Sequence, residues 1–277
     1  MPRPPKYIAV AADRLAPSPE NLFVGTSGWA YPTWKPGFYP SDVPSRAFLH
    51  HYASQLTALE VNYTFRTLPT RVQLEGWLAA TPPGFRFSFK APQRITHFAR
   101  LRDCAVEVDR FLAALEPIRE AGRLGPLLFQ LPPNFLADTT RLHAFLHHPG
   151  LQATHSSQIA FEFRHPSWFT EDTYAVLRTH RAAVCVADTD DLTTPDVTTA
   201  PFRCYRLRRD GGYTAAELAG FAERFTALAG EDEVFVFFRH QDEPTGALNA
   251  KAMLNHAADL NHAADLAAPL LALGDDQ

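Results

Sequence analysis

Eight short runs rich in β-forming residues recur along this sequence with helical patterns between most of them, and this alternation restricts the fold more than any other feature. The runs are LFVGTS (22–27), ALEVN (58–62), FRFSFK (85–90), PLLFQL (126–131), IAFEF (159–163), AVCVAD (183–188), RCYRL (203–207) and VFVFFR (234–239). Helical patterns fit residues 45–57, 69–80, 103–121, 139–147, 170–180, 214–229 and 247–268. Strands that alternate with helices indicate βα units and a parallel sheet.

The length of the chain, 277 residues, suits a single α/β barrel, which needs about 250 residues. The segment 188–203 is too short and too rich in Thr, Pro and Asp for a helix, so we expect one irregular crossover. We find no linker and predict one domain over residues 21–277. Residues 1–20 are Pro-rich and predict a loosely held arm.

Polar residues inside the strands favour a closed barrel over an open, doubly wound sheet. In FRFSFK the phenylalanines occupy one face and Arg86, Ser88 and Lys90 the other. A barrel wrapped by helices needs an apolar outer face, so the polar face should point into the lumen. We therefore predict a lumen in which three acidic side chains oppose three basic ones. They are Glu60, Glu162 and Asp188 against Arg86, Lys90 and Arg164.

Composition limits the class of protein. The net charge of −4 and the pI of about 6.3 argue against a general duplex-DNA binder, although a local basic patch remains compatible. Cys104, Cys185 and Cys204 form no CxxC pair and predict free thiols in a reducing compartment. No signal peptide and no run of about 18 apolar residues occur. We expect a cytoplasmic protein with no membrane partner.

Six segments, in order, resemble those of the YecE-like family, a widespread domain of unknown function. They are GTSGWAYPTWKPGFYP, LEVNYTF, FRFSFKAPQRITH, LLFQLPP, FEFRHPSWF and the Asp of CVAD, within about 23–249. The resemblance implies a TIM-barrel-like fold and no established reaction. Two positions depart from the family pattern. Arg66 stands where many members have tyrosine, and Arg208 follows Leu207 where many have histidine.

In TIM barrels the active site lies at the C-terminal ends of the strands and in the loops that follow. The strongest cluster there is Glu162, Arg164 and His165. Glu162 could be a general base or metal ligand, Arg164 could clamp an anion, and His165 could carry protons. A structural ion pair in the lumen, with His165 held by Pro166, would explain the same residues.

The loop RRDGGYTAAE (208–217) predicts an anion site. Two glycines precede a helix whose start, Thr214 to Glu217, fits a capping box, and a helix N-terminus offers free N–H groups to an anion. Arg208 and Arg209 add positive charge. A plain glycine turn with two solvated arginines is the alternative. In the loop after the first strand, Trp29 could stack on a sugar or base.

These patterns predict a hydrolase or lyase that acts on an anionic, phosphorylated or sugar-containing small molecule. The candidate catalytic residues are Glu162, Glu60, Asp188 and His165, and the candidate substrate-binding residues are Trp29, Asn62, Lys90, Arg164, Arg206, Arg208 and Arg209. The alternatives are a nucleic-acid-binding or nuclease-like protein with a divalent metal, and a non-catalytic metabolite-binding barrel. We expect no organic cofactor, and the candidate residues are compatible with a bound divalent metal. The sequence does not indicate the oligomeric state.

Overall fold

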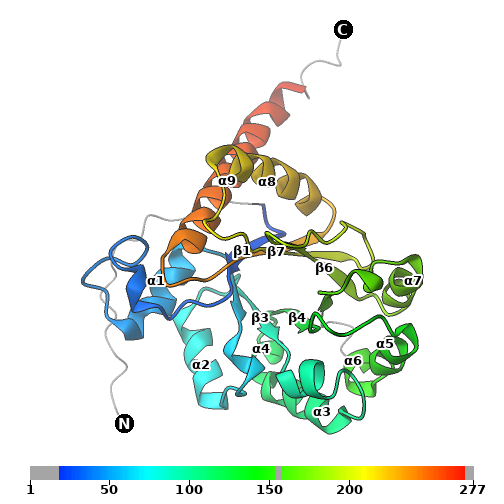
Figure 1. The fold of residues 1–277 in the computed structure, drawn as a ribbon. Coiled ribbons are helices and arrows are strands. Elements are labelled where there is room, and N and C mark those ends of the chain that lie inside the picture. Colours follow the sequence, from blue (N-terminus) through cyan, green and yellow to red (C-terminus); the bar gives the residue numbers. More distant parts are fainter. Residues whose placement is uncertain (1–18, 154–157, 272–277) are drawn as a thin grey trace.

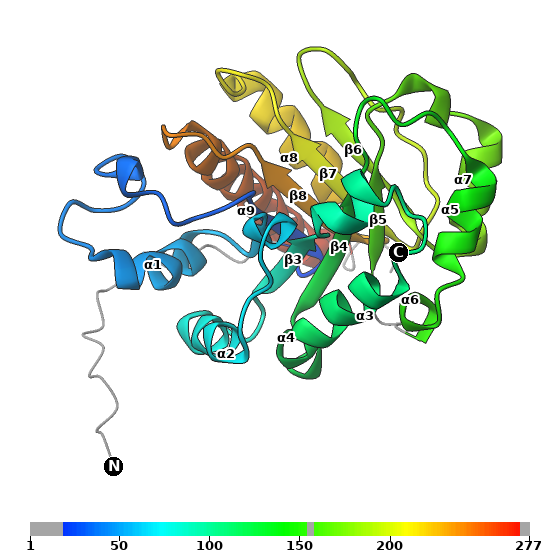
Figure 2. The ribbon, with the colours of Figure 1, turned by 60° about the horizontal axis from the view of Figure 1, so that its bottom comes forward.

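A computed structural model describes residues 19–153 and 158–271. Eight strands form one parallel sheet in the order β1-β8-β7-β6-β5-β4-β3-β2, with the helices outside it (Figures 1 and 2). The strands are β1 (Leu22–Thr26), β2 (Ala58–Val61), β3 (Arg86–Lys90), β4 (Leu124–Gln130), β5 (Ile159–Glu162), β6 (Ala183–Asp188), β7 (Phe202–Leu207) and β8 (Glu233–Phe238). Each coincides with a predicted run to within two residues, so the strand prediction is confirmed.

Helices follow most strands, as the sequence pattern predicts. They are α1 (Phe48–Gln55), α2 (Arg71–Ala80), α3 (Ala105–Ala114), α4 (Glu116–Glu120), α5 (Thr139–Leu146), α6 (Pro149–Ala153), α7 (Glu171–Thr179), α8 (Ala215–Ala229) and α9 (Thr245–Leu271). The helix expected over 103–121 is divided into α3 and α4, because Pro117 has no N–H to continue the ladder. The short helix α6 was not predicted. No helix joins β6 to β7, as expected.

The barrel is nearly closed, and side chains seal the seam between β1 and β2. The Thr57 N–H donates to the Val24 carbonyl at 3.0 Å, and the Thr57 hydroxyl accepts from the Val24 N–H at 2.8 Å. The Tyr52 hydroxyl accepts the Thr26 N–H at 2.7 Å and donates to the Ala58 carbonyl at 3.0 Å. Gly25 permits this approach, since a Cβ there would lie 1.9 Å from the Ala58 carbonyl oxygen. The first strand can therefore lie against the second without a regular ladder.

The lumen has an apolar end and a charged end. Phe23 and Phe235 stack at 4.8 Å in a buried cluster of lumen-facing residues near the amino ends of the strands. Glu60, Glu162 and Arg206 lie further along their strands and are also buried. Alternation within a strand explains the layers, because residues two apart share a face. Charge is thus concentrated at the C-terminal ends of the strands, which we call the mouth.

Candidate functional site at the barrel mouth

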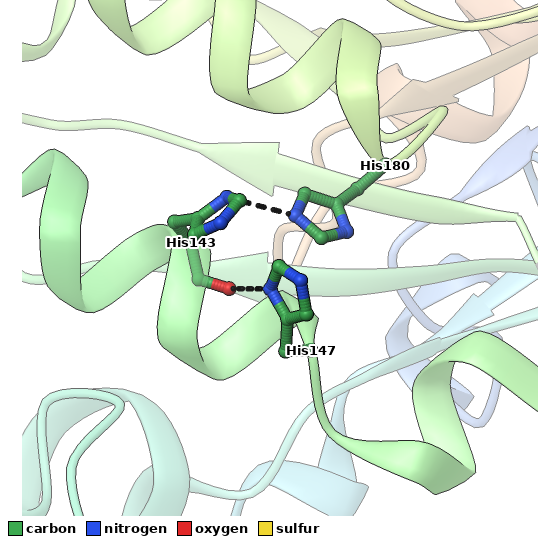
Figure 3. Close-up of side chains that lie close together, drawn as sticks. All are labelled: His143, His147 and His180. Atoms are coloured by element: carbon green, nitrogen blue, oxygen red, sulfur yellow. Dashed lines mark hydrogen bonds between the residues drawn. The ribbon is translucent and has the colours of Figure 1, made fainter.

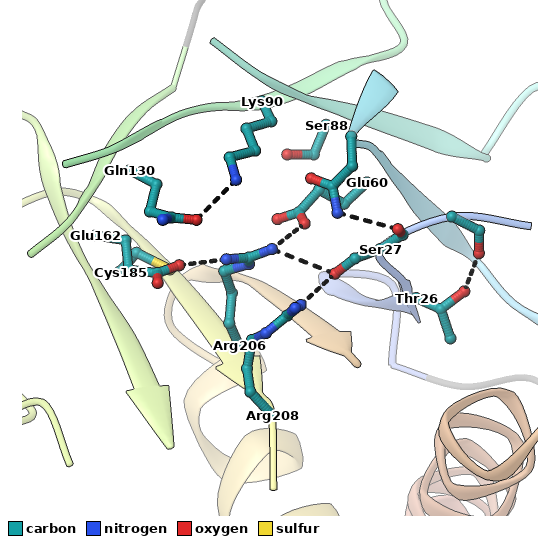
Figure 4. Close-up of polar contacts among 12 residues, drawn as sticks. Thr26, Ser27, Glu60, Ser88, Lys90, Gln130, Glu162, Cys185, Arg206 and Arg208 are labelled. Carbon is teal, nitrogen blue, oxygen red and sulfur yellow. Dashed lines mark hydrogen bonds and ion pairs between the residues drawn. The ribbon is translucent and has the colours of Figure 1, made fainter. Parts of the chain in front are cut away.

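Arg206 of β7 lies between two carboxylates from other strands (Figure 4). Its Nη2 donates to Glu60 of β2 at 2.6 Å, and its Nη1 pairs with Glu162 of β5. All three side chains are at most 1 % exposed. A buried charge without a partner would be very unfavourable, so each of these groups depends on the others. The pairing explains how the segment FEFRHPSWF can bury a carboxylate.

The pairing also sets the protonation of Glu162. Burial favours the neutral acid, but Arg206 and Arg164 outweigh it and lower the pKa of Glu162 to about 2. Arg164 forms a second ion pair with the same carboxylate. At neutral pH Glu162 is therefore ionised and held by two guanidinium groups, which fits an orienting role better than proton donation.

Positive charge exceeds negative charge at the mouth. Lys90 and Arg208 join Arg164 and Arg206, so four cationic side chains surround the two carboxylates Glu60 and Glu162. Burial and Arg206 lower the pKa of Lys90 to about 8, and burial and Arg206 lower that of Arg208 to about 10. In both groups burial and repulsion from Arg206 outweigh the attraction of Glu60 and Glu162.

Polar side chains hold these cations in place. Ser27, directly after β1, accepts from Arg208 at 2.9 Å, and its carbonyl accepts from the Asn62 amide at 3.0 Å. Lys90 donates to Gln130 of β4 at 2.8 Å and lies 4.4 Å from the centre of the Phe65 ring. Residues at the ends of several strands therefore hold the cations of the mouth in place through hydrogen bonds.

Several buried polar atoms at the mouth have no hydrogen-bond partner within the part of the chain that the structure describes. They are Oε2 of Glu60, Oδ1 of Asn62, Nε of Arg164, Nε of Arg206 and Nδ1 of His240. His240 follows β8 and stacks on Tyr31 at 5.5 Å. Burial and Arg208 lower the pKa of His240 to about 4, so its imidazole is neutral at pH 7. The mouth therefore holds buried donors and acceptors whose hydrogen bonds are not made within the described residues.

Asp188 and Arg209 lie apart from this arrangement. Asp188 lies three residues after Cys185, which faces the lumen from the same strand. Its side chain is therefore on the opposite face of β6 and points away from the lumen. It pairs with Arg209 at 3.0 Å and accepts from Tyr213 at 3.2 Å. Arg209 also pairs with Glu217 at 2.6 Å. The predicted lumen therefore needs correction: Asp188 is outside it, Arg206 is inside it, and Arg86 lies at the opposite end, over Phe23.

The predicted capping box at the start of α8 is confirmed, and it bears on the expected anion site. Thr214 accepts from the Glu217 N–H, and the Glu217 carboxylate accepts from the Thr214 N–H at 2.9 Å. A carboxylate therefore already occupies this helix N-terminus. Arg208 points to the mouth while Arg209 is held by two carboxylates, so the two arginines have separate surroundings.

His165 and Trp29 make contacts typical of packing and capping. His165 Nδ1 accepts from the Ser167 N–H at 3.2 Å and caps a short helix, Pro166–Trp168. The half-buried Trp29 packs edge-on against Trp77 at 5.3 Å. The catalytic role of His165 and the stacking role of Trp29 stay predictions. Ser27 was missed, and its only signal is a polar residue at the end of a buried strand.

The fold and the mouth define a TIM-like α/β barrel with a buried network of charge at the C-terminal strand ends. Residues 23–271 match the family described as "Protein of unknown function DUF72", and the chain belongs to that family. Among curated relatives, it is 31% identical over 154 residues to UPF0759 protein YecE of Escherichia coli K12, covering 54% of this chain and 51% of the relative. It is 29% identical over 160 residues to UPF0759 protein YunF of Bacillus subtilis, covering 55% and 54%. The chain spans about half the length of the curated relatives it matches.

Solved structures agree with the fold. A DUF72 family protein from Thermotoga maritima superposes with a TM-score of 0.72 at 27% identity, covering 84% of this chain and 97% of that one. A DUF72 family protein from Enterococcus faecalis gives 0.69 at 19% identity, covering 85% and 95%, and supports the fold alone. The resemblance to the YecE-like family is thus confirmed. Within the described residues, no helix is long and apolar enough to cross a membrane.

Proposed function

We propose that this chain is an enzyme, a hydrolase or lyase, that binds a small molecule carrying a phosphate or similar anionic group at the barrel mouth. The observation that carries the proposal is the surplus of cations, with Lys90, Arg164, Arg206 and Arg208 around only two carboxylates. A buried surplus of positive charge is costly unless an anion offsets it. Arginine recognises phosphate and carboxylate through paired N–H groups.

Within this proposal, Lys90 is the group best suited to proton transfer. With a pKa of about 8, its amine is partly neutral near pH 8 and can act as base or acid. Glu60 and Glu162 hold Arg206, and Arg208 and Arg164 face the anion. Neutral His240, with its Nδ1 buried, supplies a further hydrogen-bonding group.

The nuclease-like alternative, with a divalent metal at the mouth, has less support. A metal would need the oxygens of Glu60 and Glu162, and one oxygen of each carboxylate is already paired with Arg206, whose positive charge would repel a cation there. The non-catalytic metabolite-binding alternative shares the anion site and differs only in the absence of turnover.

The experiment is calorimetric titration of the full chain with inorganic phosphate, followed by a turnover assay with a panel of phosphate esters and glycosides. We expect phosphate to bind and Arg208→Ala to weaken it by about 10-fold or more, in line with a lost charge-assisted hydrogen bond of about 1.5–3 kcal/mol. Arg110→Ala, on the exposed side of α3, is the matched control. Failure to bind phosphate or any ester, or equal binding by Arg208→Ala, would refute the proposal. Binding without turnover across the panel would favour the non-catalytic barrel.

A further inference from the structure

Three histidines from two helices converge at the other end of the barrel. His143 lies in the last turn of α5, His147 directly follows that helix, and His180 directly follows α7. Figure 3 shows the three rings facing one another. One ring nitrogen from each lies within 4.8 Å of those of the other two. Because both helices run back toward the amino ends of the strands, this cluster lies away from the mouth.

The local structure explains the convergence. Residues four apart on a helix lie on one face, so His143 and His147 are stacked neighbours, with ring centres 4.2 Å apart. His180 completes the triangle, with its ring centre 5.0 Å from that of His143 and 4.7 Å from that of His147. His143 and His147 are exposed and His180 is half-buried, so an ion could reach them from solvent.

Hydrogen bonds prepare these imidazoles as ligands. His147 Nδ1 lies 2.9 Å from the His143 carbonyl oxygen, and since a carbonyl only accepts, Nδ1 carries the proton. The lone pair of His147 is therefore on Nε2. A backbone carbonyl that fixes the tautomer in this way is common behind metal-ligating histidines. His180 Nε2 and His143 Nδ1 meet at 3.1 Å and share one proton. An ion that binds both nitrogens replaces this proton, which moves to the other nitrogen of the same ring or to solvent.

We propose that His143, His147 and His180 bind a divalent transition-metal ion of the Zn²⁺ type. Two imidazole nitrogens on one tetrahedral ion, each at about 2.1 Å, are roughly 3.4 Å apart. The present separation of His143 and His180 is close to that value, so modest side-chain rotation completes the triangle. Three histidines with water in the fourth position form a known zinc ligand set. The C-terminal ends of α5 and α7 also favour a cation.

The surroundings leave the fourth position open. His147 lines a hollow of about 490 Å³ beside α3 and α5, and His180 lines another of about 370 Å³ beside α5 and α7. A bound ion would therefore join two helices and still exchange its water. This site is independent of the proposed anion site.

The test is calorimetric titration of the metal-free full chain with Zn²⁺, supported by the visible absorption of the Co²⁺ form as a report on tetrahedral coordination. We expect one ion per chain. His143→Ala, His147→Ala and His180→Ala should each weaken binding by about 100-fold or more, because even the loss of a second-shell partner costs 10–100-fold.

The matched control is the double variant His256→Ala/His262→Ala, which removes two exposed histidines of α9. It should bind Zn²⁺ within about two-fold of the unchanged chain. Circular dichroism and thermal unfolding in chelator check that each variant folds, and His143→Gln replaces His143→Ala if that variant does not. The proposal is overturned if the unchanged chain takes up no stoichiometric ion, if the single variants bind like it, or if the control loses as much.

Discussion

Arg206 is the residue on which the mouth depends most, because it links two carboxylates that have no other strong reason to be buried. Glu60 and Glu162 come from β2 and β5. Without Arg206, Glu60 would lose its ion pair, and Glu162 would keep only the partly exposed Arg164. Removing one partner of a buried ion pair typically costs 3–5 kcal/mol. The mouth is therefore a structural unit as well as a candidate site.

Arg206→Met should lower the free energy of unfolding by about 3–5 kcal/mol, since Glu60 loses its ion pair and Glu162 keeps only that with Arg164. Urea denaturation of the full chain, followed by circular dichroism, measures the change. Arg71→Ala, which removes an exposed partner of Glu75, should leave stability nearly unchanged. A loss for Arg206→Met as small as that of the control would mean that the pairing contributes little.

The depressed pKa of Glu162 predicts a loss of stability in acid. A carboxyl group whose pKa is about 2 in the folded chain and 4.5 in a model compound stabilises the fold above pH 4.5 and loses that contribution as pH falls toward 2. The difference corresponds to about 3 kcal/mol. Unfolding free energies from pH 5 to pH 2 should fall less steeply for Glu162→Gln. Equal slopes would contradict the assignment.

Lys90 predicts the pH dependence of anion binding. Its pKa of about 8 means that the free mouth loses one positive charge as pH rises past 8. Phosphate affinity should therefore decrease between about pH 8 and 9.5, where phosphate itself is largely the dianion. Lys90→Arg should keep its affinity to higher pH, because arginine does not lose its proton there. A fall of the same size in Lys90→Arg would remove Lys90 from the explanation.

At the scale of elements, the seam between β1 and β2 closes the barrel, and Gly25 is the residue that permits it. Seven strand pairs are joined by parallel ladders, with a register shift between β3 and β4, whereas β1 and β2 meet through Thr57, Tyr52 and close backbone contact. Closure matters to the mouth because Ser27 follows β1 and Asn62 follows β2, and the Asn62 side-chain amide donates to the Ser27 backbone carbonyl across this seam.

Gly25→Ala should destabilise the chain by about 2 kcal/mol or more, because the added methyl would lie 1.9 Å from the Ala58 carbonyl oxygen and force the strands apart. Gly76→Ala in α2 is the matched control, since no atom lies within 4 Å of its added Cβ. That change should stabilise the helix by up to about 1 kcal/mol. Thermal and urea unfolding of both variants give the comparison, and a neutral Gly25→Ala would show that the seam can open.

At the scale of the whole molecule, the net charge of −4 contrasts with the cationic mouth. An acidic surface repels a long polyanion, while a small anion can reach charges recessed at the strand ends. The contrast separates the proposed small-molecule function from the nucleic-acid alternative.

A labelled single-stranded oligonucleotide should therefore not bind at low salt, whereas inorganic phosphate should. Fluorescence anisotropy at about 20 mM salt tests the oligonucleotide, and the calorimetric titration tests phosphate. Tight oligonucleotide binding with a steep salt dependence would favour the nucleic-acid alternative instead.

Much of the fold could be predicted from the sequence because its signals are local. Alternation within FRFSFK correctly predicted that Ser88 lies in the lumen and Phe87 packs against the helices. The capping-box pattern of Thr214 and Glu217 correctly predicted the start of α8. The arm predicted for residues 1–20 lies almost wholly outside the described residues. The position of Asp188 at the end of a strand wrongly suggested that it faces the lumen. Strict alternation along AVCVAD puts Asp188 on the face opposite to Cys185.

The sequence by itself determined the strands, most helices and the polar character of the strand ends, because each depends on residues adjacent along the chain. Only the tertiary structure decided which charges meet. Arg206 reaches Glu60 across 146 positions, Arg208 reaches Ser27 across 181, and His180 reaches His143 across 37. Closure of the barrel and packing of α5 against α7 bring these residues together. The spacing of apolar residues in the sequence predicts on which face of an element a side chain lies. It does not predict which side chain of a distant element it will contact.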